Sequence, residues 1–114
     1  MVEINRKNEA GTEVLTVKGE VDASSSIDLD QAIAGCVQTG ATRILIDCTG
    51  LEYISSAGLG VFMSYVEEFH EKGVRMVLFG LNNRVAHTFS LLGLADLMDI
   101  ASDRSTADSK LHEA

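Results

Sequence analysis

Two adjacent serines, Ser55 and Ser56, are the residues of this chain best placed to do chemistry, and the segment Ala57–Gly60 follows them directly. The segment 43–46, which is apolar from Ile44 to Ile46, is typical of a buried strand, and the segment 61–66 opens an amphipathic helix. The serines therefore occupy a tight turn at a helix N-terminus, where free backbone N–H groups and the helix dipole favour negative charge. A phosphate on a serine hydroxyl is favoured there, so the sequence predicts a surface that a kinase can switch.

Other roles for Ser56 have weaker support. A serine before a helix is commonly an N-cap, and a nucleophilic serine would need a histidine and a carboxylate. No GxSxG nucleophile elbow is present, His70–Glu71 does not fit an HExxH metal site, and the glycine turn lacks a phosphate-loop lysine. We therefore expect a protein that is not an enzyme, with no catalytic residue, metal or cofactor. The histidines without an evident carboxylate partner are His70, His87 and His112.

Gly58 and Gly60 lie within the first turn of the helix, where each costs about 1 kcal/mol relative to alanine. A helix start that gives up this stability indicates close approach by another backbone. We expect that backbone to belong to a partner protein, or the space to be taken by a bound phosphate.

Asp22 and Asp47 fall at or just past the ends of expected strands. In a parallel sheet such ends converge on one edge, which would bring both carboxylates near the Ser56 turn. Two interpretations stand for each: the aspartate shapes a phosphorylation site, or it bonds to local N–H groups of its own turn.

Composition narrows the class of partner. The 114 residues predict one domain over 1–114, and the net charge of −8 argues against nucleic acid and against an anionic membrane surface. The acidity either steers the chain toward a basic partner or serves solubility alone.

The N-terminal segment is too short and polar for a signal peptide, and no stretch reaches the length of a transmembrane helix. Cys36 and Cys48 form neither a CxxC nor a zinc pattern, so we expect buried, reduced thiols and a cytoplasmic protein.

The elements alternate in type along the chain. We expect strands at 2–4, 13–18, 44–46, 74–79 and 97–100. We expect helices from the serines at 24–26 to Gly40, from the Ser55–Ser56 turn to Gly73, from an Asn83 cap to Gly93, and through Leu111 in the tail. This order predicts an α/β fold with a mixed, mainly parallel sheet of about four to five strands and helices packed on it. A short exposed N-terminal strand allows edge pairing, so we expect a monomer or a weak dimer.

Four blocks in this order resemble the STAS domain of bacterial anti-sigma-factor antagonists. The blocks are 19–22 (GEVD), 45–47 (LID), 53–60 (YISSAGLG), and 80–85 (GLNNRV) with 92–94 (LGL). The likeness runs from about Glu13 to Ile100, and the spacing of the blocks makes it specific. The resemblance implies a single STAS domain.

The family motif at the turn is commonly Asp–Ser–Ser/Thr–Gly–Leu–Gly. Anchored on Gly58–Leu59–Gly60, its phosphorylated serine corresponds to Ser56, with Ser55 in place of the aspartate and Ala57 in place of the second hydroxyl. The missing aspartate affects how a kinase would recognise the turn. The resemblance thus implies phosphorylation at Ser56 and a partner-binding surface made of Asp22, Asp47, Ser55, Ala57, Gly58, Leu59 and Gly60.

The function implied by the resemblance is partner switching. The unphosphorylated protein would bind an anti-sigma factor that is itself a serine-protein kinase and release a sigma factor, phosphorylation would end the complex, and a PP2C-type phosphatase would restore it. An alternative is a STAS subunit of a membrane transport complex, of the ABC-type lipid transport class, that works by docking alone.

Overall fold

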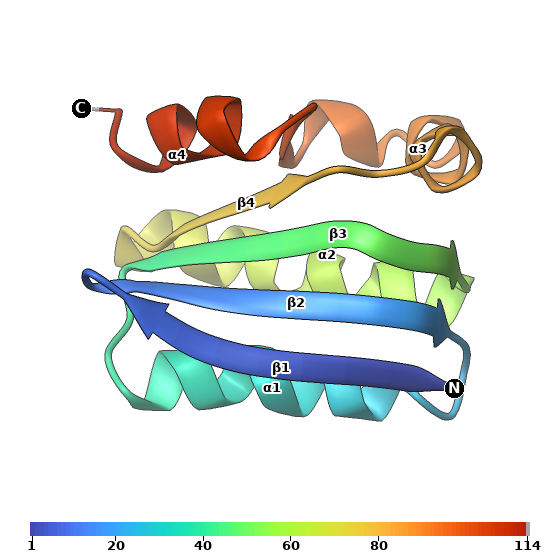
Figure 1. Ribbon diagram of the computed structural model, residues 1–114, viewed down its shortest axis with the longest axis horizontal. Coiled ribbons are helices and arrows are strands. Elements are labelled where there is room, and N and C mark those ends of the chain that lie inside the picture. Colours follow the sequence, from blue (N-terminus) through green and yellow to red (C-terminus); the bar gives the residue numbers. More distant parts are fainter. Residues whose placement is uncertain (114) are drawn as a thin grey trace.

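One five-stranded sheet, in the order β1-β2-β3-β4-β5, organises the computed structural model, which describes residues 1–113 (Figure 1). β1 and β2 are antiparallel, whereas the pairs β2–β3, β3–β4 and β4–β5 are parallel. The predicted mixed, mainly parallel sheet is therefore confirmed. The elements are β1 (Val2–Glu9), β2 (Thr12–Val21), α1 (Ser26–Gln38), β3 (Arg43–Ile54), α2 (Ser56–Lys72), β4 (Arg75–Phe79), α3 (Asn83–Leu91), the short 3₁₀ helix η1 (Leu94–Asp96), β5 (Asp99–Ala101) and α4 (Arg104–Leu111).

The first half of strand β3 is buried on both faces. Ile44 and Ile46 pack in the core beneath α1, α2 and α3, while Leu45 between them packs on the opposite face. There Leu45 meets Ala107 and Leu111 of α4. The uninterrupted apolar run in the sequence reflects this double burial, because a strand exposed on one face would alternate with polar residues. Figure 1 shows α1 and α2 side by side behind the sheet.

The helices end where the sequence predicts. Gly73 terminates α2 with φ +71°, and Gly40 follows α1 with φ +79°, a region that glycine adopts without strain. Helix α4 in the tail is also confirmed: the Asp103 side chain accepts a hydrogen bond from the Thr106 N–H, and Leu111 is buried. For α3 the predicted cap is wrong by one residue, because the Asn82 side chain, and not Asn83, accepts from the Val85 N–H (2.8 Å).

Three strands extend beyond their predicted bounds. β1 and β2 form a long hairpin closed by the two-residue turn Ala10–Gly11, whose φ values are +53° and +88°. Both residues lie in the left-handed region, as a type I′ turn requires. β3 runs on to Ile54, through polar and glycine residues that the sequence does not mark as strand.

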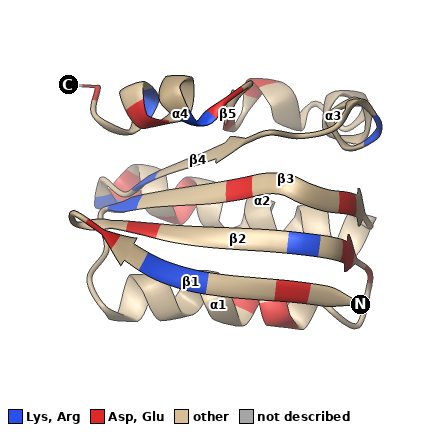
Figure 2. Ribbon diagram, viewed as in Figure 1, with Lys and Arg blue, Asp and Glu red and all other residues tan. Residues whose placement is uncertain are grey.

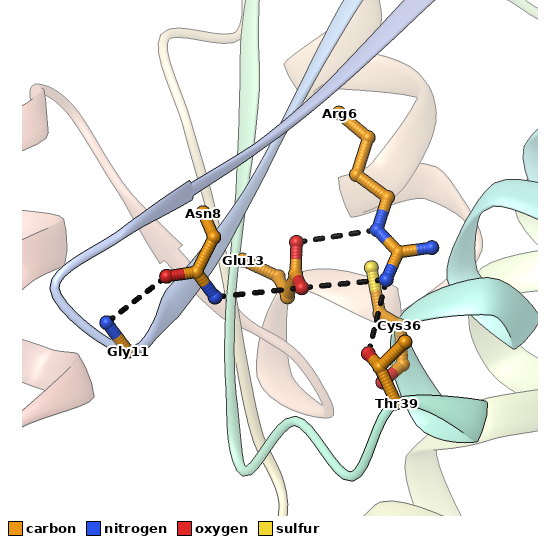
Figure 3. Close-up of polar contacts among 6 residues, drawn as sticks. All are labelled: Arg6, Asn8, Gly11, Glu13, Cys36 and Thr39. Carbon is orange, nitrogen blue, oxygen red and sulfur yellow. Dashed lines mark hydrogen bonds and ion pairs between the residues drawn. The ribbon is translucent and has the colours of Figure 1, made fainter.

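A polar cluster fixes the far end of the hairpin to the C-terminal end of α1 (Figure 3). The buried carboxylate of Glu13 accepts from the Arg6 guanidinium at 3.2 and 3.3 Å and from the Asn8 amide at 3.5 Å. Arg6 also donates to the Thr39 hydroxyl at 3.0 Å. The hydrogen bond from Arg6 lowers the pKa of Glu13, so this carboxylate stays ionised although it is buried.

We predict that Ala10→Asn stabilises the fold. An alanine in the left-handed region is strained by about 1 kcal/mol, a cost that asparagine largely avoids. The free energy of unfolding, measured by urea denaturation, should therefore rise by up to about 1 kcal/mol. Ala41→Asn, in a loop residue with negative φ, is the control and should give no gain. Equal effects of the two substitutions would contradict the prediction.

Candidate functional site

The Ser55–Ser56 turn forms where β3 meets α2. The Ser55 N–H donates to the Val21 carbonyl of β2 (2.8 Å), which ties the turn to the end of the neighbouring strand. Ser55 is the N-cap of α2: its hydroxyl accepts from the Gly58 N–H (3.3 Å), and its carbonyl accepts from the Leu59 N–H (3.0 Å). Capping is thus the role of Ser55. Serine and aspartate cap helices about equally well, so Ser55 supplies the cap that an aspartate could supply, without its charge.

Ser56 is the first residue of α2 and is exposed. Its hydroxyl has no hydrogen-bond partner among residues 1–113. Its neighbour has already taken the capping position, so the Ser56 side chain is free to react. The free N–H groups of the first helical turn lie beside it, and they favour a negatively charged substituent.

Four residues after Ser56 divide between surface and core. Ala57 and Gly60 are exposed, whereas Gly58 and Leu59 are buried. A Cβ added at Gly58 would lie 2.7 Å from Ile54 Cγ1 and 2.8 Å from Val21 Cγ1, whereas one added at Gly60 would meet nothing within 4 Å. The expectation that both glycines serve an incoming backbone or phosphate is therefore wrong for Gly58, which makes room for β-branched side chains of its own chain. Leu59 also faces inward, so Gly60 and Ala57 are the members of this run that a partner can touch.

Asp22 lies directly beyond the end of β2, next to the serine turn. Its Oδ1 accepts from the Ser25 N–H, the Ser24 hydroxyl and the Ser25 hydroxyl, each at 2.9 Å. The hydrogen bond from the Ser25 N–H is the largest cause that lowers the pKa of Asp22 to about 2. Asp22 is thus the residue that caps the turn into α1, whereas none of the serines at 24–26 supplies a side-chain cap to that helix.

Helix α1 continues alongside α2, and one contact aligns them. The Tyr65 hydroxyl of α2 donates to the Asp30 carboxylate of α1 (2.8 Å). Burial, with this hydrogen bond, raises the pKa of Tyr65 to about 12, so the phenol keeps its proton. The Asp22 turn and the Ser55–Ser56 turn are therefore held at neighbouring helix starts on one end of the sheet.

Asp47 does not join them. The prediction that it lies at a strand end is wrong, because β3 continues to Ile54. Asp47 shares the strand face of Leu45, opposite α2, and its Oδ1 accepts from the Thr49 N–H (3.0 Å) and hydroxyl (2.7 Å). Its role in the structure is a local turn contact.

The surface around the turn carries several acidic residues, and it includes a cation, Arg84, whose place beside the turn the sequence did not indicate. Figure 2 shows acidic segments at the C-terminal ends of β2 and β3, where the exposed residues are Glu20 and Glu52. Beside them the Arg84 guanidinium of α3 lies 6.0 Å from the centre of the Tyr53 ring, and Tyr53 is 40% exposed. No spacing rule links these two residues; they meet because the start of α3 packs against the end of β3, where Asn82 donates to the Leu51 carbonyl.

The described residues offer few groups that are arranged for catalysis or metal binding. His70, His87 and His112 are all exposed, and residues 1–113 contain no cluster of three metal-binding side chains. A cavity of about 390 Å³ lies at the other end of α2, where Val66, His70 and Gly73 face Leu97 and Asp99, and not at the glycine turn. Among the described residues no helix is long and apolar enough to cross a lipid bilayer.

The fold and the turn define a STAS domain. The sequence profile of that family matches residues 3–107, so the chain belongs to the STAS domain family.

Two relatives of this chain carry the same name. The chain is 32% identical over 84 residues to the anti-sigma-B factor antagonist of Listeria monocytogenes, covering 74% of each chain. It is 26% identical over 84 residues to that of Staphylococcus aureus, covering 74% of this chain and 78% of the relative.

Solved structures show the same fold. An anti-sigma factor antagonist from Mycobacterium paratuberculosis superposes with a TM-score of 0.87 at 20% identity, covering 99% of this chain and 96% of the other. The anti-sigma factor antagonist SpoIIAA in its unphosphorylated form superposes with a TM-score of 0.79 at 21% identity, covering 98% of this chain and 99% of the other.

We predict that the same substitution has different effects on stability at the two glycines. Gly60→Ala should stabilise the fold by about 1 kcal/mol, because alanine favours the helix and has free space. Gly58→Ala gains the same propensity but forces Val21 and Ile54 apart, an overpacking cost of about 1 to 3 kcal/mol. Its free energy of unfolding should therefore fall below that of Gly60→Ala. Chemical denaturation of both variants tests this, and a Gly58→Ala protein as stable as Gly60→Ala would contradict it.

We predict that Asp22 makes stability depend on pH in acid. The folded-state pKa of about 2 lies below the ordinary value of 3.8, so the contribution of Asp22 is complete above pH 3.8 and is lost as the pH falls toward 2. The stability difference between the wild-type chain and Asp22→Asn should be constant above this window and shrink within it. Denaturation at a series of pH values measures the difference, and parallel curves down to pH 2 would contradict the assignment.

Proposed function

We propose that this chain is a cytoplasmic anti-sigma factor antagonist that acts by binding and is switched by phosphorylation of Ser56. In the unphosphorylated state it binds an anti-sigma factor that is also a serine-protein kinase, and a sigma factor is released. A PP2C-type phosphatase resets the switch. The observation that carries this proposal is the exposed, unbonded Ser56 hydroxyl at the start of α2, next to a serine that already serves as the cap.

The binding surface follows from which residues of the turn are exposed. Ser56, Ala57 and Gly60 present small side chains along the first turn of α2, so a partner backbone can approach closely. The Asp22 turn lies beside them, and the acidic rim of Glu20 and Glu52 suits a partner with basic residues. Gly58 and Leu59 support this surface from below, and Asp47 lies outside it.

Phosphorylation would act on the interface and leave the fold in place. A phosphate adds about −1.5 to −2 charges and three hydrated oxygens to the first helical residue. The helix N-terminus favours that charge, so α2 is not disrupted. A partner packed on Ala57 and Gly60 would instead have to desolvate the phosphate, and each 1.4 kcal/mol lost weakens binding about tenfold.

Similar proteins support the switch. The curated relatives are named as anti-sigma-B factor antagonists, and SpoIIAA has been solved in both unphosphorylated and phosphorylated forms.

A second candidate function is docking within a membrane transport complex. The murine anion transporter Slc26a9 contains a region of this fold with a TM-score of 0.74 at 16% identity, covering 92% of this chain and 18% of the transporter. That likeness concerns the fold alone, and the free Ser56 hydroxyl favours the switch.

We predict that Ser56 is the acceptor and that a negative charge there blocks binding. The chain, purified from its own host, is incubated with ATP and the serine kinase that co-purifies with it, and the sites are mapped by mass spectrometry. Phosphate should appear on Ser56, persist in Ser55→Ala and be absent from Ser56→Ala. Ser56→Asp should weaken binding to that kinase at least tenfold by calorimetry.

Ser105→Asp is the matched control, because Ser105 is also an exposed serine in the first turn of a helix, α4. It should bind as the wild-type chain does. Phosphate on another residue, or equal binding by Ser56→Asp and Ser105→Asp, would refute the switch. Recovery of transporter subunits in place of a kinase would favour the docking role.

A further inference from the structure

Strand β1 forms an open edge of the sheet. It has eight residues and β2 as its sheet neighbour, and Figure 1 shows its other side free along its whole length. The sequence predicts a strand of only three residues here, so the structure offers a longer edge than expected. A long edge strand is a template for another strand unless something blocks it.

The hydrogen-bonding register determines which backbone N–H and C=O groups of β1 are free to bond to another strand. Residues of β1 and β2 pair in an unbroken antiparallel register from Val2–Gly19 to Glu9–Thr12, and the Glu20 N–H donates to the Met1 carbonyl at 3.0 Å. Odd-numbered residues of β1 therefore bond to β2, because hydrogen-bonded and non-bonded pairs alternate. The N–H and C=O groups of Val2, Ile4, Arg6 and Asn8 point to the open edge.

The charges along this edge are self-complementary. On the sheet face that also carries α4, Glu3 lies near the start of β1 and Lys7 near its end, with Asn5 between them, and all three are exposed. Figure 2 shows the acidic and basic segments at these two positions. An antiparallel copy of the same strand, centred on Asn5, would place Glu3 opposite Lys7 of the second copy at both ends.

Other symmetric registers fit less well. Centring on Arg6 would put the two Arg6 side chains opposite each other and Glu3 opposite Glu9, and like charges in facing positions are destabilising. Centring on Ile4 would leave Glu3 facing Asn5 without an opposite charge. On the helix face Arg6 lies over Gly35 and Thr39 of α1, so its guanidinium is already held within its own chain.

We propose that the chain forms a symmetric dimer through β1, in which two copies join as one continuous ten-stranded sheet centred on Asn5. Facing pairs Val2–Asn8 and Ile4–Arg6 carry the hydrogen bonds, and the Glu3–Lys7 pairs fix the register. The two strands run in opposite directions, so the Ser56 turns lie at opposite ends of the joined sheet. Each copy therefore keeps its own turn accessible, and the dimer is independent of the Ser56 switch.

Charge exchange tests the interface. Sedimentation equilibrium over a concentration series should show dimerisation of the wild-type chain, with association weakened at least tenfold by Lys7→Glu and by Glu3→Lys. The double variant Glu3→Lys/Lys7→Glu should restore it, because the pairs re-form with opposite sense. Lys72→Glu makes the same charge change on α2 and should leave association unchanged. Circular dichroism confirms that each variant is folded.

A cysteine tests the register. Asn5→Cys should form a disulfide-linked dimer on mild oxidation, because facing non-bonded residues lie about 4.5 Å apart between Cα atoms, within disulfide range. Lys7→Cys, opposite Glu3, should link far less. The native Cys36 and Cys48 are buried and do not interfere. A wild-type chain that stays monomeric at about 1 mM, or a double variant as weak as the single ones, would overturn the proposal.

Discussion

The parallel pairing of β2 with β3 is the constraint on which the rest of the structure depends. It runs to the last residues of both strands, Val21 and Ile54, and its final hydrogen bond passes from the Ser55 N–H to the Val21 carbonyl. The two strands end together, so the two helices that follow also begin together. This shared end sets the Asp22 turn beside the Ser56 turn. A shift of the pairing by one residue would reverse which side chains of the shifted strand face the core.

Local polar contacts then assign distinct tasks to neighbouring residues. Ser55 caps α2, and Asp22 stabilises the turn into α1. Gly58, which has no side chain, leaves the space that Val21 and Ile54 fill. Ser56, Ala57 and Gly60 have no comparable role in the fold, and they are the exposed residues of the turn. Because the fold does not depend on these exposed residues, the charge of the site can change without changing the fold. That separation makes the turn suitable for a reversible modification.

The sequence predicts the parts of this fold that are governed by burial. The apolar run of β3, the inward faces of α1 and α2, and the turn at Ser55–Ser56 could all be read from residue types alone. Prediction from the sequence fails where burial gives no pattern. β1 is an edge strand with exposed polar residues from Asn5 to Asn8, and the end of β3 contains Thr49, Gly50 and Glu52. The placement of Asp47 failed for the same reason. Contacts such as Tyr53 with Arg84 join distant segments and leave no local signal.

The order of the strands in space is also their order in the chain, and this bears on how the protein is made. Each new strand can add to the edge of the existing sheet as it leaves the ribosome, so the chain can fold progressively from its N-terminus. Helix α4 is the exception, because it comes last and covers Val14, Leu45 and Val77. Until residues 104–111 emerge, that apolar face of the nascent sheet stays open to water and to chaperones, although the Ser56 turn has long been synthesised.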